Sequence, residues 1–229
     1  MASDQVRVTV GDGFFDAYLA LPPSGSGPGL LLIQEIFGVN DHIRSVADRW
    51  AQEGFVVLAP DLFWRLKPNI ELGYEGEEFE KALQYFEEFD EAKGIADLKE
   101  ASTHLRDLKP CTGRIGAIGF CLGGKLTFRL SAHFNLNAAV SYYGVYIDQH
   151  LDEIDRIKCQ IILHFAELDH FVSKESVDKI KSAVKPRPNF TVYTYPGVDH
   201  GFSCDARAAY NKDAAALAFQ RSLDLFNKP

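Results

Sequence analysis

Cys121 has the surroundings expected of a reactive thiol. It lies between Gly119 and Gly123 in the stretch IGFCLGGKL, and Gly124 follows directly. Glycine loses more backbone entropy on folding than any other residue, so three glycines near one thiol indicate a geometry that larger side chains would block. The pattern G-x-C-x-G matches the strand-to-helix turn that presents a nucleophile in many hydrolases. The alternative is a buried cysteine beside a glycine turn, since free cysteines are commonly buried.

Partners for this thiol occur later in the chain. A cysteine nucleophile needs a general base, and the base needs a group that orients it. Asp169 in ELDHF and His200 in GVDHGF follow Cys121 in the order nucleophile, acid, base. Considered alone, Asp169 would be interpreted as a cap at a strand end, and His200 as an ordinary loop histidine. His164 lies inside an expected strand and is assigned to the core, while His170 ranks well below His200 as the base.

Two further groups belong to the same predicted site. Glu35 in LIQEIFG follows a buried strand, where its carboxylate could accept a hydrogen bond from the thiol or take its proton. Its alternative interpretation is a solvated loop acid. The N–H of Leu122 opens the helix after Cys121 and is expected to stabilise an oxyanion. The same helix N-terminus favours an anion, which makes a thiol there a better nucleophile.

The elements that must position these residues alternate between strand and helix. VRVTV and DAYLAL predict a hairpin with Gly11, Asp12 and Gly13 in its turn. Further strands are expected at 30–34, 55–60, 113–120, 137–144, 159–169 and 189–196, and those at 30–34 and 55–60 are expected to be buried. Helices are expected at 41–53 with Asp41 as N-cap, at 78–108 with a break near Gly94, and at 122–132, 173–184 and 213–226. This order favours an α/β fold with a mostly parallel twisted sheet and helices on both faces, in one domain over 1–229.

Composition narrows the classes of function. The 229 residues carry a net charge of -8, which disfavours binding to nucleic acid or to anionic membranes. The acidic residues of 78–108 are interpreted as a solvated face, although a role in binding is the alternative. The four cysteines lie far apart and form no CxxC pair, so neither a structural zinc site nor a disulfide framework is expected.

The chain shows no targeting signal. No apolar signal-peptide core opens it and no run is long enough to span a bilayer, so a cytoplasmic location is expected. The longest irregular segment, 63–76, is interpreted equally as a lid over a site or as an ordinary loop.

The motifs QEIFG, GFCLGG, LDHFV and HGF, in this order and spacing, resemble those of the dienelactone hydrolase family (carboxymethylenebutenolidases). The resemblance runs over nearly the whole chain. It implies an α/β-hydrolase fold of minimal size with no separate cap domain and no metal or cofactor. It also implies a triad of Cys121, Asp169 and His200, with Glu35 controlling the charge of the thiol. The backbone N–H groups of Ile36 and Leu122 would form the oxyanion hole.

The chain departs from the best-known members where they bind a substrate carboxylate with two arginines. Phe79 and Cys204 lie near those positions. Arg207 is a candidate substitute for one arginine, and Arg65 or Lys67 for the other. Without a secure cation, neutral esters are the expected substrates.

The sequence therefore predicts a cysteine-dependent hydrolase of small-molecule esters or lactones that works through a thioester acyl-enzyme, as a monomer or homodimer. The pocket is expected to be lined by Phe37, Phe79 and Phe202. The alternatives are a promiscuous aryl esterase or phosphotriesterase that uses the same site, and a non-catalytic thiol sensor or binding protein.

Overall fold

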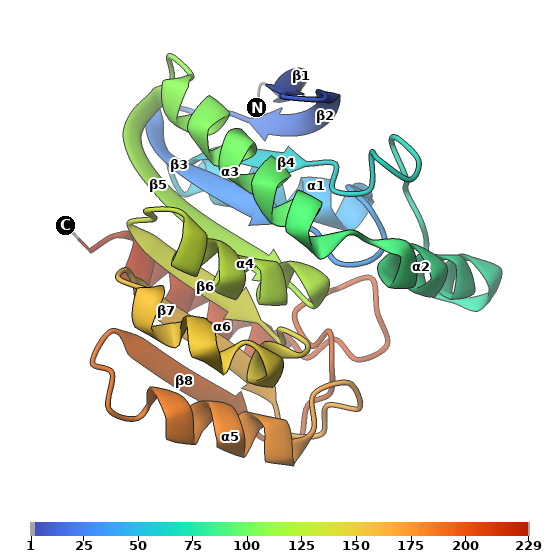
Figure 1. Cartoon of the computed structure of the whole chain (residues 1–229), viewed down its shortest axis with the longest axis vertical. Helices are drawn as coiled ribbons and strands as arrows, with labels where there is room; N and C mark the ends of the chain where they lie inside the picture. The colour runs from blue at the N-terminus through green and yellow to red at the C-terminus, as the bar shows by residue number, and fades with distance from the viewer. Residues whose placement is uncertain (1–2, 229) are drawn as a thin grey trace. The chain divides into compact units, whose positions relative to one another are not determined.

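The computed structural model describes residues 3–228, and the contacts between residues divide the chain into two compact units, Met1–Ala117 and Ile118–Pro229. Strand β5 (Cys111–Phe120) carries the chain from the first unit into the second. Each unit is a layered arrangement of strands and helices (Figure 1). The expectation of a single domain over 1–229 stays a prediction.

The first unit begins with the predicted hairpin. Strands β1 (Ser3–Val10) and β2 (Gly13–Ala20) pair antiparallel, with Val10 opposite Gly13. Strand β2 also pairs antiparallel with β4 (Val56–Pro60), which in turn pairs parallel with β3 (Gly27–Ile33). Every residue of β4 and nearly every residue of β3 is buried, as expected for strands that helices cover on both sides.

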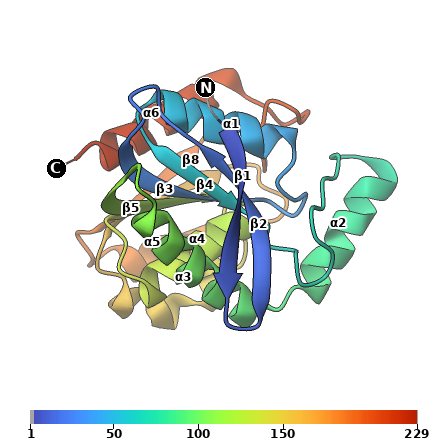
Figure 2. The same ribbon diagram turned by 90° about the horizontal axis from the view of Figure 1, so that it is seen from above.

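Two of the helices in the first unit cover opposite faces of these strands. Helix α1 (Asp41–Gln52) lies on one face and α3 (Glu91–Asp107) on the other (Figure 2). The N-cap of α1 is Asn40 rather than the predicted Asp41, because the Asn40 side chain accepts the N–H of Ile43 at 3.2 Å. Asp41 is the first helical residue, where a carboxylate still favours the positive end of the helix.

The predicted helical region 78–108 breaks, but not near Gly94. Helix α2 (Gly76–Glu88) ends before Phe89, and α3 begins after Asp90, whose side chain accepts the N–H of Lys93 at 3.0 Å. Gly94 lies inside α3, where a Cβ atom would stand 2.2 Å from the Phe89 ring. The glycine therefore leaves room for a packed ring, and the N-cap at Asp90 starts the second helix.

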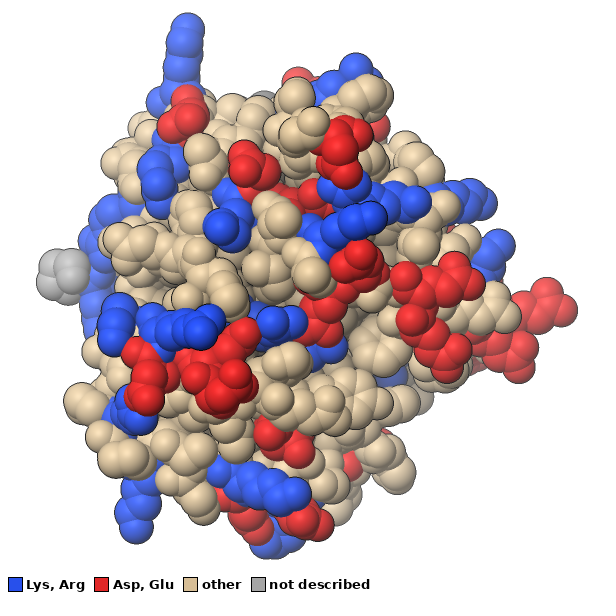
Figure 3. Space-filling model, viewed as in Figure 1, with Lys and Arg blue, Asp and Glu red and all other residues tan. Residues whose placement is uncertain are grey.

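Helix α2 is the exposed, acidic element of the first unit. Ala82 is its only buried residue, and acidic side chains gather over it in Figure 3. Its five glutamates are all exposed, which agrees with the solvated face predicted for this part of the chain.

The segment 63–76 is held within the first unit at several points. Phe63 and Ile70 are buried, and Glu71 forms a β-bridge with Gly38. The Glu71 carboxylate also binds the guanidinium of Arg44 at 2.6 Å. These contacts give the segment a fixed course beside α1.

The second unit is built on three parallel strands. Strand β7 (Gln160–Ala166) pairs with both β6 (Ala138–Tyr142) and β8 (Phe190–Tyr195). Figures 1 and 2 show α4 (Leu122–His133) and α5 (Lys174–Val184) on one face and α6 (Lys212–Phe226) on the other. The short 3-10 helices η1 (Ile147–Gln149) and η2 (Leu151–Arg156) follow β6. Because the strands are parallel, the loops after them emerge at one edge, the usual place for ligands in α/β folds.

His164 belongs to the core of this unit, as predicted from its position in a strand. It is fully buried, its Nδ1 lies 2.8 Å from the hydroxyl of Tyr195, and its Nε2 lies 3.1 Å from the hydroxyl of Ser222. Burial, together with the positive charge of Arg221, lowers its pKa to about 3. A neutral, fully bonded imidazole of this kind has a structural role.

Across residues 3–228, no helix combines the length and the apolar character needed to cross a membrane.

Candidate active site

Cys121 lies at the strained junction between β5 and α4. It is the N-cap of α4 with φ 55° and ψ -114°, a left-handed region that costs energy for any residue with a side chain. The surrounding backbone holds it there. The N–H of Cys121 donates to the carbonyl of Tyr142 at 3.0 Å, and its own carbonyl accepts the N–H of Lys125 at 3.1 Å. The thiol-bearing residue is thus fixed between the end of β6 and the first turn of α4.

The flanking glycines are required by close backbone approach. A Cβ atom on Gly119 would stand 2.1 Å from the carbonyl oxygen of Gly123, and one on Gly124 would stand 2.7 Å from the carbonyl oxygen of Tyr142. Contacts under 3.0 Å essentially never occur for real Cβ atoms. The structure therefore agrees with the interpretation of GFCLGG as a tight strand-to-helix turn.

Asp169 and His200 meet although 31 positions separate them in the chain. Nδ1 of His200 lies 2.9 Å from Oδ2 and 3.0 Å from Oδ1 of Asp169. Both side chains are nearly removed from solvent, with 2% of His200 and none of Asp169 exposed. An ionised carboxylate only accepts hydrogen bonds, so the proton lies on Nδ1 and Nε2 is left facing away from Asp169.

The Asp169 carboxylate is anchored by its own loop. Its Oδ1 accepts the N–H of Phe171 at 2.8 Å and the N–H of Val172 at 2.9 Å. A buried carboxylate is costly unless it is paired and hydrogen-bonded, and Asp169 satisfies both conditions. The result is a rigid acceptor for the imidazole of His200.

The second nitrogen of the same imidazole is not bound by Asp169. Nε2 of His200 is buried and makes no hydrogen bond of ordinary geometry within residues 3–228. Burial opposes a charge on His200, but the negative charge of Cys121 and the hydrogen bond with Asp169 outweigh it and raise the pKa of His200 to about 10. The neighbours of His200 therefore favour the charged imidazolium form of its ring.

Two aromatic rings contact the His200 imidazole. The ring of Tyr143 lies 4.8 Å away and that of Phe171 lies 4.9 Å away, both between centroids. Tyr143 is itself fully buried at a positive φ of 37°, and its hydroxyl bonds to that of Ser203 at 2.8 Å. These contacts limit rotation of the imidazole.

The other predicted site groups are the backbone N–H groups of Leu122 and Ile36 and the carboxylate of Glu35. Leu122 is the first residue of α4, so its N–H is one of those without an acceptor inside the helix. Glu35 and Ile36 follow β3 in the first unit, and both are buried, with exposed fractions of 1% and 6%. Burial excludes the interpretation of Glu35 as a solvated loop acid.

The predicted pocket phenylalanines divide into two groups. Phe37 and Phe79 contact each other in the first unit with ring centroids 6.0 Å apart. Phe202 is fully buried and packs against Tyr142, Tyr143 and Tyr195. With no exposed surface, Phe202 is a core residue and not the pocket residue that we expected, because the loop after β8 turns its ring inward.

The candidate cations also differ from expectation. Arg65 is bound bidentately by Asp12, at 2.6 and 2.7 Å, and again by Asp97, at 2.8 and 2.9 Å, so it is not available as a substrate clamp. Cys204 is fully buried. The Arg207 guanidinium lies over the backbone of Gly201, next to His200, where a Cβ atom on that glycine would stand 2.7 Å from its Nη1.

One residue beside His200 was missed by the sequence analysis. Asp199 accepts the His200 N–H at 2.6 Å and binds the ring of His170 at 2.7 Å. The signal was present in the sequence, because the dipeptide Asp-His occurs at both 169–170 and 199–200.

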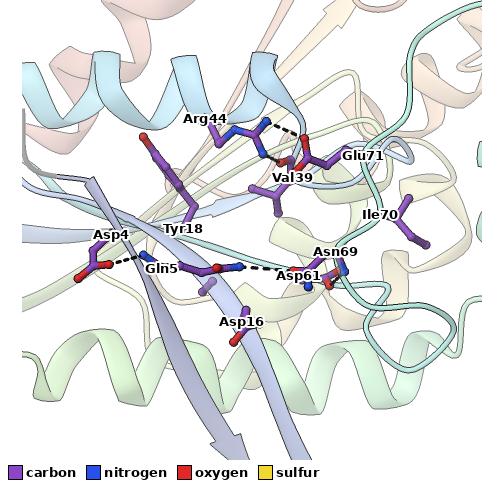
Figure 4. A pocket seen from close by; sticks show the side chains of 11 residues that line it. Asp4, Gln5, Asp16, Tyr18, Val39, Arg44, Asp61, Asn69, Ile70 and Glu71 are labelled. Carbon is purple, nitrogen blue, oxygen red and sulfur yellow. Dashed lines mark hydrogen bonds and ion pairs between the residues drawn. The ribbon is translucent and has the colours of Figure 1, made fainter.

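A separate cavity of about 370 Å³ lies beside β1 and β2 in the first unit (Figure 4). It is acidic, and none of the predicted site residues lines it. Burial raises the pKa of Asp61, one of its lining residues, to about 6. The Asp61 carboxylate is engaged within the protein, since it accepts the N–H groups of Phe63 and Asn69.

Within residues 3–228, no group of three or more histidine, cysteine or acidic side chains is arranged to hold a metal ion.

Comparison with known proteins identifies relatives over the length of the chain. The model of the dienelactone hydrolase family matches residues 15–229. Carboxymethylenebutenolidase 1 of Cupriavidus pinatubonensis is 34% identical, over 98% of this chain and 97% of its own length. A carboxymethylenebutenolidase of a Pseudomonas species is 33% identical, over 95% and 92% respectively.

Solved structures extend the likeness to the fold. A crystal structure named for a dienelactone hydrolase of Klebsiella pneumoniae has a TM-score of 0.90 and 25% identity, and covers 100% of this chain and 99% of that one. A dienelactone hydrolase-like promiscuous phosphotriesterase from metagenomic libraries has a TM-score of 0.83 and 22% identity, with 98% and 97% covered. The predicted fold class is confirmed.

Proposed function

The chain belongs to the dienelactone hydrolase family and is a hydrolase of ester or lactone bonds, and on this premise we propose that it works through Cys121 as nucleophile. His200 is the general acid and base, and Asp169 orients it. The observation that carries the proposal is the buried His200 imidazole, which is bonded to Asp169 on one nitrogen and raised in pKa by the charge of Cys121.

In the first step, the thiolate of Cys121 attacks the substrate carbonyl carbon. A C–S bond forms, and the electron pair of the carbonyl moves to its oxygen. The N–H of Leu122, at the start of α4, and that of Ile36 are proposed to donate to this oxyanion. The intermediate collapses by breaking the C–O bond of the ester, and His200 transfers a proton from Nε2 to the leaving oxygen. A thioester remains on Cys121.

In the second step, water hydrolyses the thioester. His200 is now neutral and accepts a proton from water at Nε2, while the resulting hydroxide attacks the thioester carbon. The C–S bond breaks, and the acid product leaves with the thiolate restored. Asp169 keeps the Nδ1 proton in place through both steps, so the imidazole always presents Nε2 to the reacting atoms.

Glu35 is proposed to control the charge of the thiol, as the family resemblance implies. A buried carboxylate near a thiol favours the protonated thiol over the thiolate. This role would keep the resting cysteine less reactive until substrate changes the balance.

The test is a single-turnover experiment with p-nitrophenyl acetate. Mass spectrometry of acid-quenched samples should find one acetyl group on the peptide that contains Cys121, and steady release of p-nitrophenol should follow. Cys121→Ala should lose both signals, and Cys159→Ala should keep both. A thiol sensor without catalysis would acylate once and not turn over. Turnover in Cys121→Ala near the wild-type rate would overturn the proposal.

A further inference from the structure

Two Asp-His dipeptides meet across the loops that follow β7 and β8. Asp169 and His170 belong to the first loop, and Asp199 and His200 belong to the second. Each acid binds the histidine of the other loop: Asp169 binds Nδ1 of His200 at 2.9 Å, and Asp199 binds Nδ1 of His170 at 2.7 Å. The two pairs thus connect the same two loops at adjacent residues.

The Asp199 carboxylate also binds the backbone of both loops. Its Oδ1 accepts the N–H of His200 at 2.6 Å and the N–H of His170 at 3.3 Å. The side chain therefore holds the main chain at the residue that carries the proposed general base. An acid that bound only a flexible side chain would not restrain the main chain in this way.

These bonds continue the sheet pairing beyond the ends of the strands. After β7 and β8 end, the N–H of Glu167 donates to the carbonyl of Tyr195 at 3.0 Å, and the N–H of Leu168 donates to the carbonyl of Val198 at 2.9 Å. Asp199 is the next residue along. Backbone hydrogen bonds therefore connect the two loops up to Leu168 and Val198, and the Asp199 side chain binds them at the next positions.

We propose that Asp199, held by His170, is a positioning residue that keeps the His200 imidazole aligned with Asp169. The inference rests on the proposed function, because it assigns a role around the same imidazole. Asp199 does not touch the reacting atoms in this scheme. It acts through the backbone of His200, and His170 acts through Asp199.

A role in stability alone is a poor explanation for the pair. The side chains of His170 and Asp199 are 77% and 37% exposed, and ion pairs at such exposed sites contribute little to folding. The hydrogen bond that the Asp199 carboxylate accepts from the His170 ring raises the pKa of His170. Alignment of a general base, in contrast, is sensitive to small displacements, since about 1 Å of misplacement can cost about 100-fold in rate.

The experiment compares steady-state kinetics of matched variants on p-nitrophenyl acetate. We expect Asp199→Ala to lower kcat by about 10- to 100-fold with KM changed by less than about twofold. Asp199→Asn should recover part of the loss, because its amide oxygen still accepts one backbone N–H. His170→Ala should show a smaller loss. The control is Asp178→Ala, which removes an exposed ion pair with Lys174 on α5 and should leave kcat unchanged.

A second readout follows the imidazole directly. The NMR resonance of the His200 Nδ1 proton reports its hydrogen bond with Asp169, and it should shift or broaden in Asp199→Ala but not in Asp178→Ala. Wild-type kcat in Asp199→Ala, or a lower kcat with an unchanged resonance, would overturn the positioning role. His200→Gln separates this failure from that of the proposed function: if His200→Gln keeps wild-type activity, then the proposed general base is wrong. If Asp199→Ala fails to fold, then Asp199→Asn supplies the same two measurements.

Discussion

The imidazole of His200 and the carboxylate of Asp169 lie 2.9 Å apart in a place that solvent hardly reaches. Removal of Asp169 leaves the His200 imidazole buried without its Nδ1 partner. Removal of His200 leaves a buried carboxylate that only the N–H groups of Phe171 and Val172 still bind. Removing one member of a buried, hydrogen-bonded pair is strongly destabilising, by about 3–5 kcal/mol for ion pairs. We therefore expect the pair to act as one unit in folding and, under the proposed mechanism, in catalysis.

Asp169→Asn and His200→Ala should be strongly non-additive. Either change alone disables the same proton transfer, so the double variant should lose little more activity than the worse single variant. The measurement is kcat/KM for the wild type, both single variants and the double variant. Losses that multiply in the double variant would show that at least one of the two residues has been misassigned.

Removing the charge of Cys121 should lower the pKa of His200 from about 10. The thiolate favours the imidazolium, so in Cys121→Ala this contribution disappears while burial still disfavours the charge. An NMR titration of the imidazole measures the change. Cys159→Ala is the control, because burial raises the pKa of Cys159 to about 11 and the thiol is therefore neutral at assay pH. An unchanged titration in Cys121→Ala would mean that the thiol and the imidazole do not interact.

Glu35→Gln should make Cys121 react faster with iodoacetamide at neutral pH. The substitution removes a negative charge and keeps the size of the side chain, so a thiolate nearby would be favoured. The measurement is the labelling rate of Cys121 as a function of pH, together with the rate of acylation by an ester. Glu53→Gln, which changes an exposed acid in the same unit, is the control. If both rates stay at the wild-type values, then Glu35 does not control the thiol.

Neutral aryl esters should be better substrates than carboxylated lactones by about tenfold or more in kcat/KM. A carboxylate that enters a partly dry site needs a fixed cation, and here Arg65 is already engaged and Cys204 is buried. Arg207, beside Gly201, and the exposed Lys67 are the remaining candidates. Both substrate classes should be measured on the wild type and on Arg207→Ala. A preference for the charged lactone that disappears in Arg207→Ala would show that Arg207 supplies the clamp.

The buried His164 should make the protein lose stability in acid. Its folded pKa of about 3 lies below the ordinary value of 6.5, so the unfolded chain binds a proton that the folded chain does not. The stabilising contribution is complete above pH 6.5 and declines as the pH falls toward 3, at up to about 1.4 kcal/mol per pH unit. His164→Asn should reduce this slope in urea unfolding between pH 7 and pH 4 by about one proton. Equal slopes in the two proteins would contradict the assignment.

Much of the second unit could be predicted because its signals are local. The strands before Cys121 and Asp169 end in buried, mostly apolar residues, and glycine flanks the thiol where the backbones meet. His164 could be assigned to the core from its position inside β7. In each case the neighbouring residues in the sequence carried the information.

The predictions that were wrong are of two kinds. Some required a choice between neighbouring residues, and others depended on contacts between segments that are distant in the sequence. Asn40 and Asp41 are both good N-caps, and only the observed backbone shows which one accepts the N–H of Ile43. Gly94 looked like a helix breaker, but its role depends on the position of the Phe89 ring. Phe202 faces the core and Arg65 faces Asp97, and both facts depend on tertiary packing.

The positive φ of Cys121 means that selection for stability and selection for activity favour different residues at this position. Cys121→Gly is inactive under the proposed mechanism, but glycine would adopt this backbone conformation without the roughly 1–3 kcal/mol that it costs a residue with a side chain. A library screened for thermal stability alone would therefore be expected to enrich glycine at position 121 and, under the proposed mechanism, to lose activity. Selection for thermal stability should therefore be combined with selection for turnover. The backbone conformation of Cys121 lowers the stability of the fold and, under the proposed mechanism, also positions the nucleophile.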